Sequence, residues 1–266
     1  MTTSTTALDE IARKIAGSER VVFLTGAGLS VASGIAPYRK SKDAVWARFI
    51  TEWGTMEKFH EDPLAWWREF WLKAHPSLLD GEKPKPNPGH DAIAGIVKDR
   101  AQHLVITQNI DGLHRASGVA EDKLVEIHGR ADRFVCSDAS CDNYVDALDR
   151  IDNGAIESGA IPTCAKCGEP VRPLVLLFDE MYDSHPAYQM FKARKALNHA
   201  EVVVFVGTSF SVGITDYAVR AAAYEGATLV NVNIEPASGY GVSWVDVLGP
   251  SETTLPELAR RIADAR

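Results

Sequence analysis

The stretch from residue 25 to residue 39 reads Thr-Gly-Ala-Gly-Leu-Ser-Val-Ala-Ser-Gly-Ile-Ala-Pro-Tyr-Arg. It follows Val21-Val22-Phe23-Leu24, a short apolar run that predicts a buried strand. The strand ends in glycines, and a helix is predicted to start near Ser30. Dinucleotide-binding folds use such a strand–glycine–helix junction to present backbone N–H groups to a pyrophosphate. Gly26 and Gly28 would let the backbone approach phosphates because neither carries a Cβ. An ordinary strand-to-helix turn has the same pattern, so this loop alone leaves both interpretations open.

Length and composition are those of a folded globular chain. The 266 residues are 45% hydrophobic and 24% charged, which suffices to bury a sizeable core. The formal charge of −8 argues against a nucleic-acid partner, which needs a basic surface, and is compatible with basic peptides. The first 25 residues lack an apolar core of signal-peptide length, and no apolar run is of membrane-spanning length. We therefore expect a cytoplasmic protein without a membrane partner, and the oligomeric state is left open.

Further apolar segments indicate an open, parallel α/β sheet. Short β-branched runs predict three more strands, at residues 104–107, 202–206 and 229–233. Helices are expected over residues 7–16 and 89–98, the second after a proline-rich connector at residues 84–88. The tryptophan-rich residues 40–80 predict packed helices, and the polar residues 130–172 predict a small module inserted between the two halves of the sheet.

Four cysteines fall in two pairs with metal-binding spacing. Cys136 and Cys141 are separated by four residues, and Cys164 and Cys167 by two. Two such knuckles can complete a tetrahedral Zn²⁺ site, and four thiolates leave no open coordination position, so the metal would be structural. Free or redox-active thiols are the alternatives, whereas a disulfide scaffold does not fit four cysteines without an export signal.

Polar residues follow several predicted strands. Thr107-Gln-Asn-Ile-Asp-Gly-Leu-His114 ends one strand, Gly207-Thr208-Ser209 a second and Asn233-Ile234-Glu235 a third. In an open parallel sheet, ligands bind beyond the carboxyl ends of the strands, so these groups are expected to face a cofactor. His128 lies just before the cysteine module, at a junction where pockets tend to form. Turn chemistry for the strand ends, and a structural role for the histidine, are the alternatives.

Taken together, these segments resemble the sirtuin family of NAD-dependent protein deacylases. The matching motifs occur in order along almost the whole chain: Gly26-Ala-Gly-Leu-Ser30, Ser33-Gly-Ile35 with Tyr38-Arg39, Pro86-Asn87 with His90, Thr107–His114, His128-Gly129, both cysteine pairs, Arg172-Pro173, Gly207-Thr-Ser209 and Asn233-Ile-Glu-Pro236.

The resemblance implies a Rossmann-like, doubly wound parallel sheet with a smaller domain in two pieces. The NAD-binding domain would comprise residues 1–39, 84–129 and 173–266. A helical insertion at 40–83 and a zinc ribbon at 130–172 would form the small domain. The expected reaction removes acetyl or other uncharged acyl groups from protein lysines. The acyl oxygen attacks C1′ of the nicotinamide ribose, and nicotinamide and O-acyl-ADP-ribose are released.

The resemblance also assigns residues. His128 would be the general base, a role that suits an imidazole near neutral pH, and Asn109 would position a water and the ribose. Two further groups are implied by the same motifs. The nicotinamide pocket would be lined by Ala27, Ile35, Ile110 and Asp111. Other cofactor contacts would come from Gly26, Gly28, Ser30, Tyr38, Arg39, Gln108, Gly207, Thr208, Ser209, Asn233, Glu235 and Ser251.

The chain departs from the family pattern in three places. Proline is moved one position in Ala36-Pro37, aspartate replaces glycine at Asp179 in the substrate-binding strand, and the loop after Ser209 lacks a usual proline. A charge at Asp179 is expected to favour basic peptides or to lower activity.

Acyl preference and rival activities also follow from the resemblance. Trp71 and Ala74 stand where succinyl-selective members carry tyrosine and arginine, so acetyl-lysine is expected to be preferred; a core role for Trp71 would leave the preference open. The same fold can support ADP-ribosyl transfer to protein, NAD hydrolysis, or a non-enzymatic NAD-binding scaffold, and these are the alternative functions.

Overall fold

Six parallel strands form the main sheet of the computed structural model, which describes residues 5–35, 44–75, 83–144, 147–148 and 150–265. Their order across the sheet is β3-β2-β1-β6-β7-β8. The strands are β1 (Val21–Thr25), β2 (Leu104–Thr107), β3 (Leu124–Glu126), β6 (Val202–Val206), β7 (Thr228–Asn233) and β8 (Val245–Leu248). The chain moves outward from β1 in one direction and then from β6 in the other. The strand order therefore reverses between β1 and β6, and a ligand crevice is expected at their carboxyl ends.

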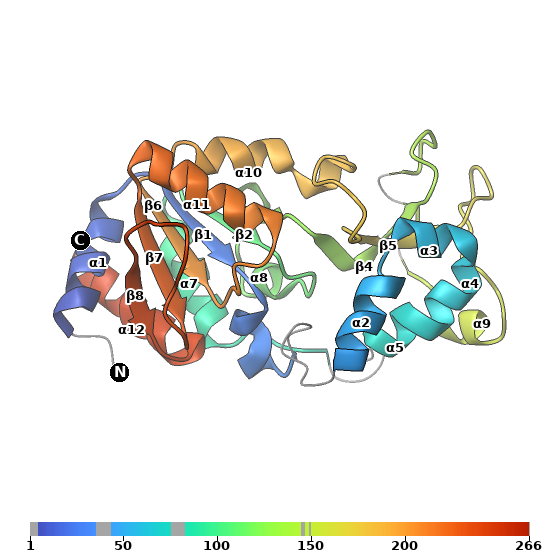
Figure 1. The fold of residues 1–266 in the computed structure, drawn as a ribbon, viewed down its shortest axis with the longest axis horizontal. Helices are drawn as coiled ribbons and strands as arrows, with labels where there is room; N and C mark the ends of the chain where they lie inside the picture. Colours follow the sequence, from blue (N-terminus) through green and yellow to red (C-terminus); the bar gives the residue numbers. More distant parts are fainter. Residues whose placement is uncertain (1–4, 36–43, 76–82, 145–146, 149, 266) are drawn as a thin grey trace.

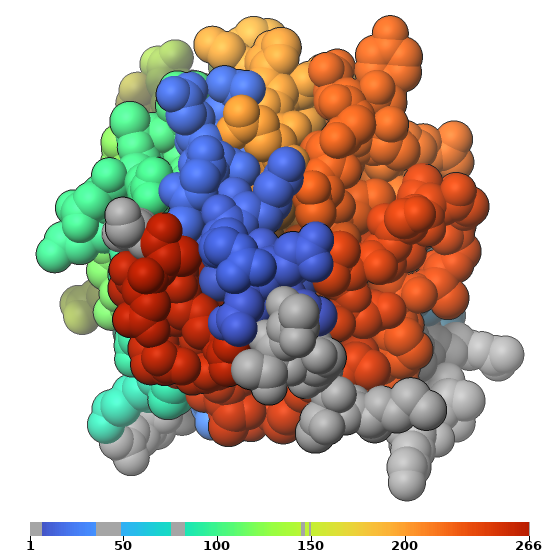
Figure 2. Space-filling model, turned by 90° about the vertical axis from the view of Figure 1, so that its left-hand side faces the viewer, coloured from blue at the N-terminus to red at the C-terminus, as the bar shows by residue number. Residues whose placement is uncertain are grey.

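Helices cover both faces of this sheet, as the predicted fold class requires (Figure 1). On one face lie α1 (Thr5–Gly17), α7 (Pro88–Lys98) and α12 (Ser251–Asp264), and on the other lie α10 (Met190–Leu197) and α11 (Gly213–Glu225). In β1, Val21 and Phe23 pack on the first face, whereas Val22 and Leu24 pack on the second. At one end of the molecule α1 lies beside α12 (Figure 2), where Asp9 pairs with Arg261. The doubly wound α/β class is confirmed.

The loop after β1 differs from its prediction. The helix predicted to start near Ser30 is a 3-10 helix, η1, which spans Ala27–Ser33 and so begins earlier, directly after Gly26. It ends at Gly34, whose φ of +86° is in the left-handed region that favours glycine. The helix predicted over residues 89–98 begins at Pro88, which takes the first helical position, and Asn87 caps it with His90 in a capping box.

A second, smaller core lies beside the main sheet, on the right in Figure 1. Its antiparallel strands are β4 (Gly129–Cys136) and β5 (Val171–Val175), a pair that extends across the predicted boundaries at residues 129/130 and 172/173. Around them lie α2 (Ala44–Trp53), α3 (Met56–Glu61), α4 (Pro63–Ala65), the π-helix η3 (Trp66–Trp71), α5 (Leu72–Ala74) and α9 (Asn153–Glu157). The shorter elements α8 (Leu113–Ala116), η4 (Glu121–Lys123) and η5 (Pro186–Tyr188) connect the remaining segments.

Tryptophan rings from the helical stretch fill this second core. Trp66, Trp67 and Trp71 are all buried, and the Trp67 indole N–H donates to the Val171 carbonyl at 3.0 Å. Trp67 also lies 6.3 Å from Phe134, measured between ring centroids. The helical stretch and the cysteine-bearing stretch therefore share one set of buried side chains. None of the helices in the described ranges is long and apolar enough to cross a membrane.

Five histidines of the described residues are buried, and burial lowers the pKa of three of them most strongly. The pKa of His75 falls to about 4, as does that of His90. For His114 burial, together with repulsion from His90, lowers the pKa to about 3. The rings of His90 and His114 lie 5.2 Å apart, so two imidazolium charges would also repel each other there.

We predict that the free energy of unfolding falls as the pH drops from about 6.5 toward 4. In that range the unfolded chain binds protons on these histidines and the folded chain does not, so each contributes a slope of up to about 1.4 kcal/mol per pH unit. Urea unfolding measured at several pH values checks this. His114→Gln, which keeps a polar group beside Thr25, should reduce the slope by close to one proton; an unchanged slope would contradict the prediction.

Candidate active site at the carboxyl edge of the sheet

The loops that follow β1 and β6 touch through their backbones. The Gly26 N–H donates to the Val206 carbonyl at 2.9 Å, and the Gly28 N–H donates to the Gly207 carbonyl at 2.8 Å. A Cβ at Gly28 would lie 2.7 Å from the Cα of Gly207, closer than real atoms pack. Gly207 itself has a φ of +57°. The close approach that the structure shows for Gly28 is therefore to Gly207, and it brings two predicted cofactor loops together.

Three predicted site residues form one hydrogen-bonded cluster beside these loops. The Ser30 hydroxyl donates to Asp111 Oδ2 at 2.7 Å, and the Asn109 amide donates to Ser30 Oγ at 3.0 Å and to the Gly26 carbonyl at 3.1 Å. Asp111 Oδ1 accepts the Leu113 N–H at 2.9 Å. Burial raises the pKa of Asp111, against the lowering effect of these hydrogen bonds. The segments that follow β1 and β2 thus together form one hydrogen-bonded cluster of polar side chains.

His128 is held at the same edge by the end of β2. Its Nδ1 lies 2.8 Å from the Gln108 carbonyl oxygen, which can only accept, so Nδ1 carries the hydrogen. The neutral ring then has an unprotonated Nε2. The Gln108 side chain donates to the Thr25 carbonyl and to Thr208 Oγ1, both at 3.3 Å. Ile110 lies alongside, its carbonyl accepting the Ala131 N–H of β4 at 3.0 Å.

The remaining predicted residues lie at the ends of β6 and β7. The Asn233 amide donates to the Thr208 carbonyl at 2.9 Å, and the hydroxyls of Ser209 and Ser211 lie 2.6 Å apart. Glu235 is exposed beyond the end of β7. Ser251 is buried as the first residue of α12, and its carbonyl lies against Gly89. Ala27 and Ile35 are half-buried, at the start of η1 and just past its end, and the Ile35 N–H donates to the Ser30 carbonyl at 3.2 Å. Ala36, Pro37, Tyr38 and Arg39 lie outside the described residues.

A layer of buried polar side chains lies next to the site, and most of them were not predicted from the sequence. Thr25 Oγ1 bonds Thr107 Oγ1 and His114 Nε2, both at 2.9 Å. The Asn87 amide donates to the Leu29 carbonyl at 2.8 Å and to Ser33 Oγ at 3.0 Å. The threonines that end β1 and β2 side by side were the available signal, because hydroxyls inside an apolar sheet need partners.

Asp179 has a structural role that the sequence did not predict. Its carboxylate accepts the N–H groups of Met56 at 2.7 Å and of Glu57 at 3.1 Å, at the start of α3. The adjacent Phe178 N–H donates to the Gly54 carbonyl at 2.9 Å. The segment after β5 is therefore fastened to the helical stretch, and the Asp179 charge is engaged there.

Trp71 is a core residue, the alternative left open by the sequence. Its side chain is 1% exposed, stacks on Trp66 at 5.7 Å and lies 3.9 Å from the His75 ring. Ala74 is half-buried at the end of α5. Lys73 is 60% exposed and pairs with Glu69. The argument for acyl preference therefore cannot rest on Trp71 lining an acyl pocket.

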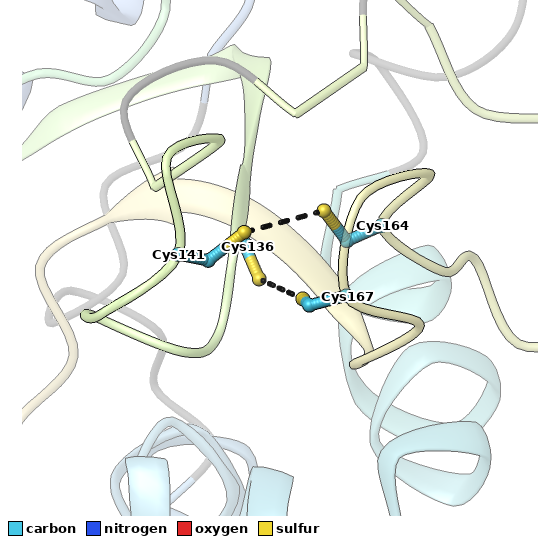
Figure 3. Close-up of side chains that lie close together, drawn as sticks. All are labelled: Cys136, Cys141, Cys164 and Cys167. Atoms are coloured by element: carbon cyan, nitrogen blue, oxygen red, sulfur yellow. Dashed lines mark hydrogen bonds between the residues drawn. The ribbon is translucent and has the colours of Figure 1, made fainter.

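The four cysteines converge as the spacing predicted. Their sulfur atoms all lie within 4.8 Å of one another, with 3.4 Å between Cys136 and Cys167 and 3.8 Å between Cys141 and Cys164 (Figure 3). Zn–S bonds of about 2.3 Å in a tetrahedron place sulfurs about 3.8 Å apart, so the cluster has the size of a zinc site.

The backbone around the thiols also suits a metal. The N–H groups of Asp138 and Asn143 each point at a cysteine sulfur two residues earlier, at 3.4 Å. Backbone N–H groups of Cys167 and Lys166 lower the pKa of the Cys164 thiol to about 6, whereas burial raises that of Cys136. Donors aimed at sulfur stabilise thiolates, the form that Zn²⁺ requires. The four cysteines are thus positioned to bind a structural zinc.

Fold and site together define a Rossmann-like α/β protein with a cysteine-rich module beside its main parallel sheet (Figure 1). The sequence model of the Sir2 family matches residues 26–213 of this chain. The NAD-dependent deacetylase sir2E of Dictyostelium discoideum is 40% identical over 266 aligned positions, covering 95% of this chain and 76% of that protein. The chain therefore belongs to the Sir2 family, as the resemblance implied.

Solved structures agree with this assignment. A complex of a Sir2 homologue with NAD superimposes with a TM-score of 0.81 at 26% identity, covering 99% of this chain and 96% of that one. A Sir2 enzyme bound to a myristoylated histone peptide gives a TM-score of 0.70 at 27% identity, covering 98% of both chains.

We predict about one zinc per chain and its loss in Cys164→Ser, together with a lower melting temperature, because metal binding at a closed thiolate site contributes folding free energy. Elemental analysis of protein purified without chelators, and thermal unfolding, check this. Lys166→Ala is the control, since this exposed side chain lies in the same knuckle and pairs with Asp142 at 3.1 Å. Zinc-free wild-type protein would refute the prediction.

Proposed function

We propose that this protein uses NAD to remove acetyl or other uncharged acyl groups from protein lysines, giving nicotinamide and O-acyl-ADP-ribose. The observation that carries the proposal is the meeting of Ser30, Asn109, Asp111 and His128 at the strand-order reversal of a Sir2-family fold. The names of the relatives support it: one is an NAD-dependent deacetylase, and one similar structure holds an acylated histone peptide. NAD supplies the electrophilic ribose carbon when it is bound.

Each proposed residue has a task that its contacts suit. His128, whose Nδ1 is engaged by a carbonyl, presents Nε2 as the base that takes the proton of a ribose hydroxyl. Asn109, fixed by Ser30 and the Gly26 carbonyl, orients a water and the ribose. Asp111 and the half-buried Ala27, Ile35 and Ile110 would border the nicotinamide. We propose that the other residues expected from the sequence to contact the cofactor also do so.

We also propose that the two parts of the chain have different functions. Residues 1–39, 84–129 and 173–266 would bind NAD, and residues 40–83 with 130–172 would form the small domain. The acyl-lysine peptide would lie between them, near the segment that Asp179 fastens to α3. The cytoplasm is the proposed compartment.

Product analysis separates this function from its alternatives. With NAD and an acetyl-lysine peptide, mass spectrometry should detect O-acetyl-ADP-ribose and the deacetylated peptide. ADP-ribosylated protein would instead indicate a transferase, free ADP-ribose without deacetylation an NAD hydrolase, and unchanged NAD a non-enzymatic binding protein.

His128→Ala should lower the deacylation rate by roughly 10²-fold or more, the loss expected when a general base is removed, while NAD affinity and melting temperature change little. Steady-state kinetics, NAD titration and thermal unfolding measure the three quantities. His199→Ala is the matched control, because this exposed histidine precedes β6, at the opposite edge of the sheet. Near-wild-type turnover in His128→Ala would remove this residue from the mechanism.

We predict a higher kcat/KM on acetyl-lysine than on succinyl-lysine in the same peptide, by at least about tenfold. Within residues 66–74 the two cations, Arg68 and Lys73, are both exposed, so this stretch offers an acyl carboxylate no buried partner. A desolvated carboxylate without a partner is costly, whereas an acetyl group is not. Paired assays on the two peptides check this, and equal or faster desuccinylation would contradict it.

A further inference from the structure

Tyr182 approaches His128 from the segment after β5, and the proposed function gives this tyrosine no role. It lies 54 positions further along the chain, and its hydroxyl oxygen is 3.5 Å from His128 Nε2. The two rings are stacked, with centroids 5.8 Å apart and an angle of 23° between their planes. The tyrosine therefore contacts the nitrogen of His128 that faces away from the Gln108 carbonyl.

The directions of these hydrogen bonds are fixed at both ends. At one end, the Gln108 carbonyl can only accept, so His128 Nδ1 donates and Nε2 of the neutral ring accepts. At the other end, the Ile214 N–H can only donate, and it lies 3.2 Å from the Tyr182 hydroxyl oxygen. The tyrosine oxygen thus accepts from the backbone and directs its own hydrogen to His128 Nε2.

The Tyr182 hydroxyl is held in place by contacts within the protein, independently of any ligand. Ile214 lies in the first turn of α11, where backbone N–H groups have no partner within the helix, and the N-cap residue Val212 gives no side-chain cap. Tyr182 supplies that acceptor. Like Phe210 and Val212, Tyr182 packs against the buried cluster on this face of the sheet, and its ring would lie 3.4 Å from a Cβ at Gly213.

We propose that Tyr182 is a positioning residue for His128. Its hydroxyl donates to the unprotonated Nε2 of the tautomer that the Gln108 carbonyl selects, and its ring fixes the plane of the imidazole. This rests on the proposed function, in which Nε2 takes a proton from a ribose hydroxyl. A 3.5 Å contact is long, so a substrate hydroxyl can replace it.

The Tyr182 hydroxyl can also form a hydrogen bond with the protonated imidazole of His128. Once Nε2 carries the proton taken from the substrate, it becomes a donor, and the tyrosine hydroxyl turns about its C–O bond. Its second lone pair then accepts from Nε2, while the first keeps the bond from the Ile214 N–H. The proton stays on His128 in this step, and no other group changes its charge. Tyr182 therefore orients the imidazole both before and after proton transfer.

Tyr182→Phe tests the proposal because it removes the hydroxyl and keeps the ring. Tyr217→Phe is the matched control, since it removes a hydroxyl that bonds Asn198 at 2.7 Å and packs in the same cluster. Nitrogen-15 NMR of the imidazoles, without substrates and assigned with His128→Ala, reports the tautomer and the hydrogen bonding of Nε2. The expected result is a shifted His128 Nε2 resonance in Tyr182→Phe and an unshifted one in Tyr217→Phe.

Kinetics complete the test. We expect kcat to fall about tenfold in Tyr182→Phe, with KM for NAD and peptide within about twofold of wild type, and no such fall in Tyr217→Phe. An unshifted Nε2 resonance overturns the proposal, as does unchanged kcat or a lower melting temperature as the sole effect. Failure of the proposed function is distinguishable, because it appears as turnover retained in His128→Ala, while the NMR measurement still reports whether Tyr182 holds the ring.

Discussion

The contact between the backbones of Gly28 and Gly207 is the constraint on which the rest of the site depends. A methyl group at Gly28 would meet Gly207 at 2.7 Å, so the loops after β1 and β6 can close on each other only if both residues lack a side chain. This closure places the 3-10 helix beside Thr208. The Gln108 side chain then bonds both Thr208 and the end of β1. Three strand ends become one edge, although they come from distant parts of the sequence.

A second dependence links the two inserted stretches. The helical stretch can bury its tryptophans because strands β4 and β5 lie against them, and Cys136 and Cys164 belong to the same buried cluster. Metal bound by the four thiolates would fix the ribbon on which Trp67 packs. The bonds from Met56 and Glu57 to Asp179 then tie α3 to the segment after β5. The aromatic rings and the carboxylate therefore hold these stretches together as one unit, which bound zinc would reinforce.

The sequence predicted those features whose pattern lies within a short stretch of residues, and not those that depend on contacts between distant residues. Four strands were predicted because each is a short apolar run, and the cysteine cluster because knuckle spacing is local. Strands β3 and β8 of the main sheet were missed, since one has three residues and the other contains Asp246, which bonds Asn231 in the neighbouring strand. The 3-10 helix, the Asp179 cap and the Tyr182 contact all depend on partners far along the chain. No periodicity or motif could have placed them.

The hydrogen bonds that the site makes with itself decide what it can offer a ligand. Both hydrogens of the Asn109 amide are engaged, by Ser30 and by the Gly26 carbonyl, so this side chain presents its carbonyl oxygen. His128, with Nδ1 committed to Gln108, presents an unprotonated Nε2. Two acceptors at one edge suit hydroxyl groups and water rather than anions. The fold thus presents these hydrogen-bonding groups in a fixed arrangement before any ligand arrives, which lowers the cost of ordering one.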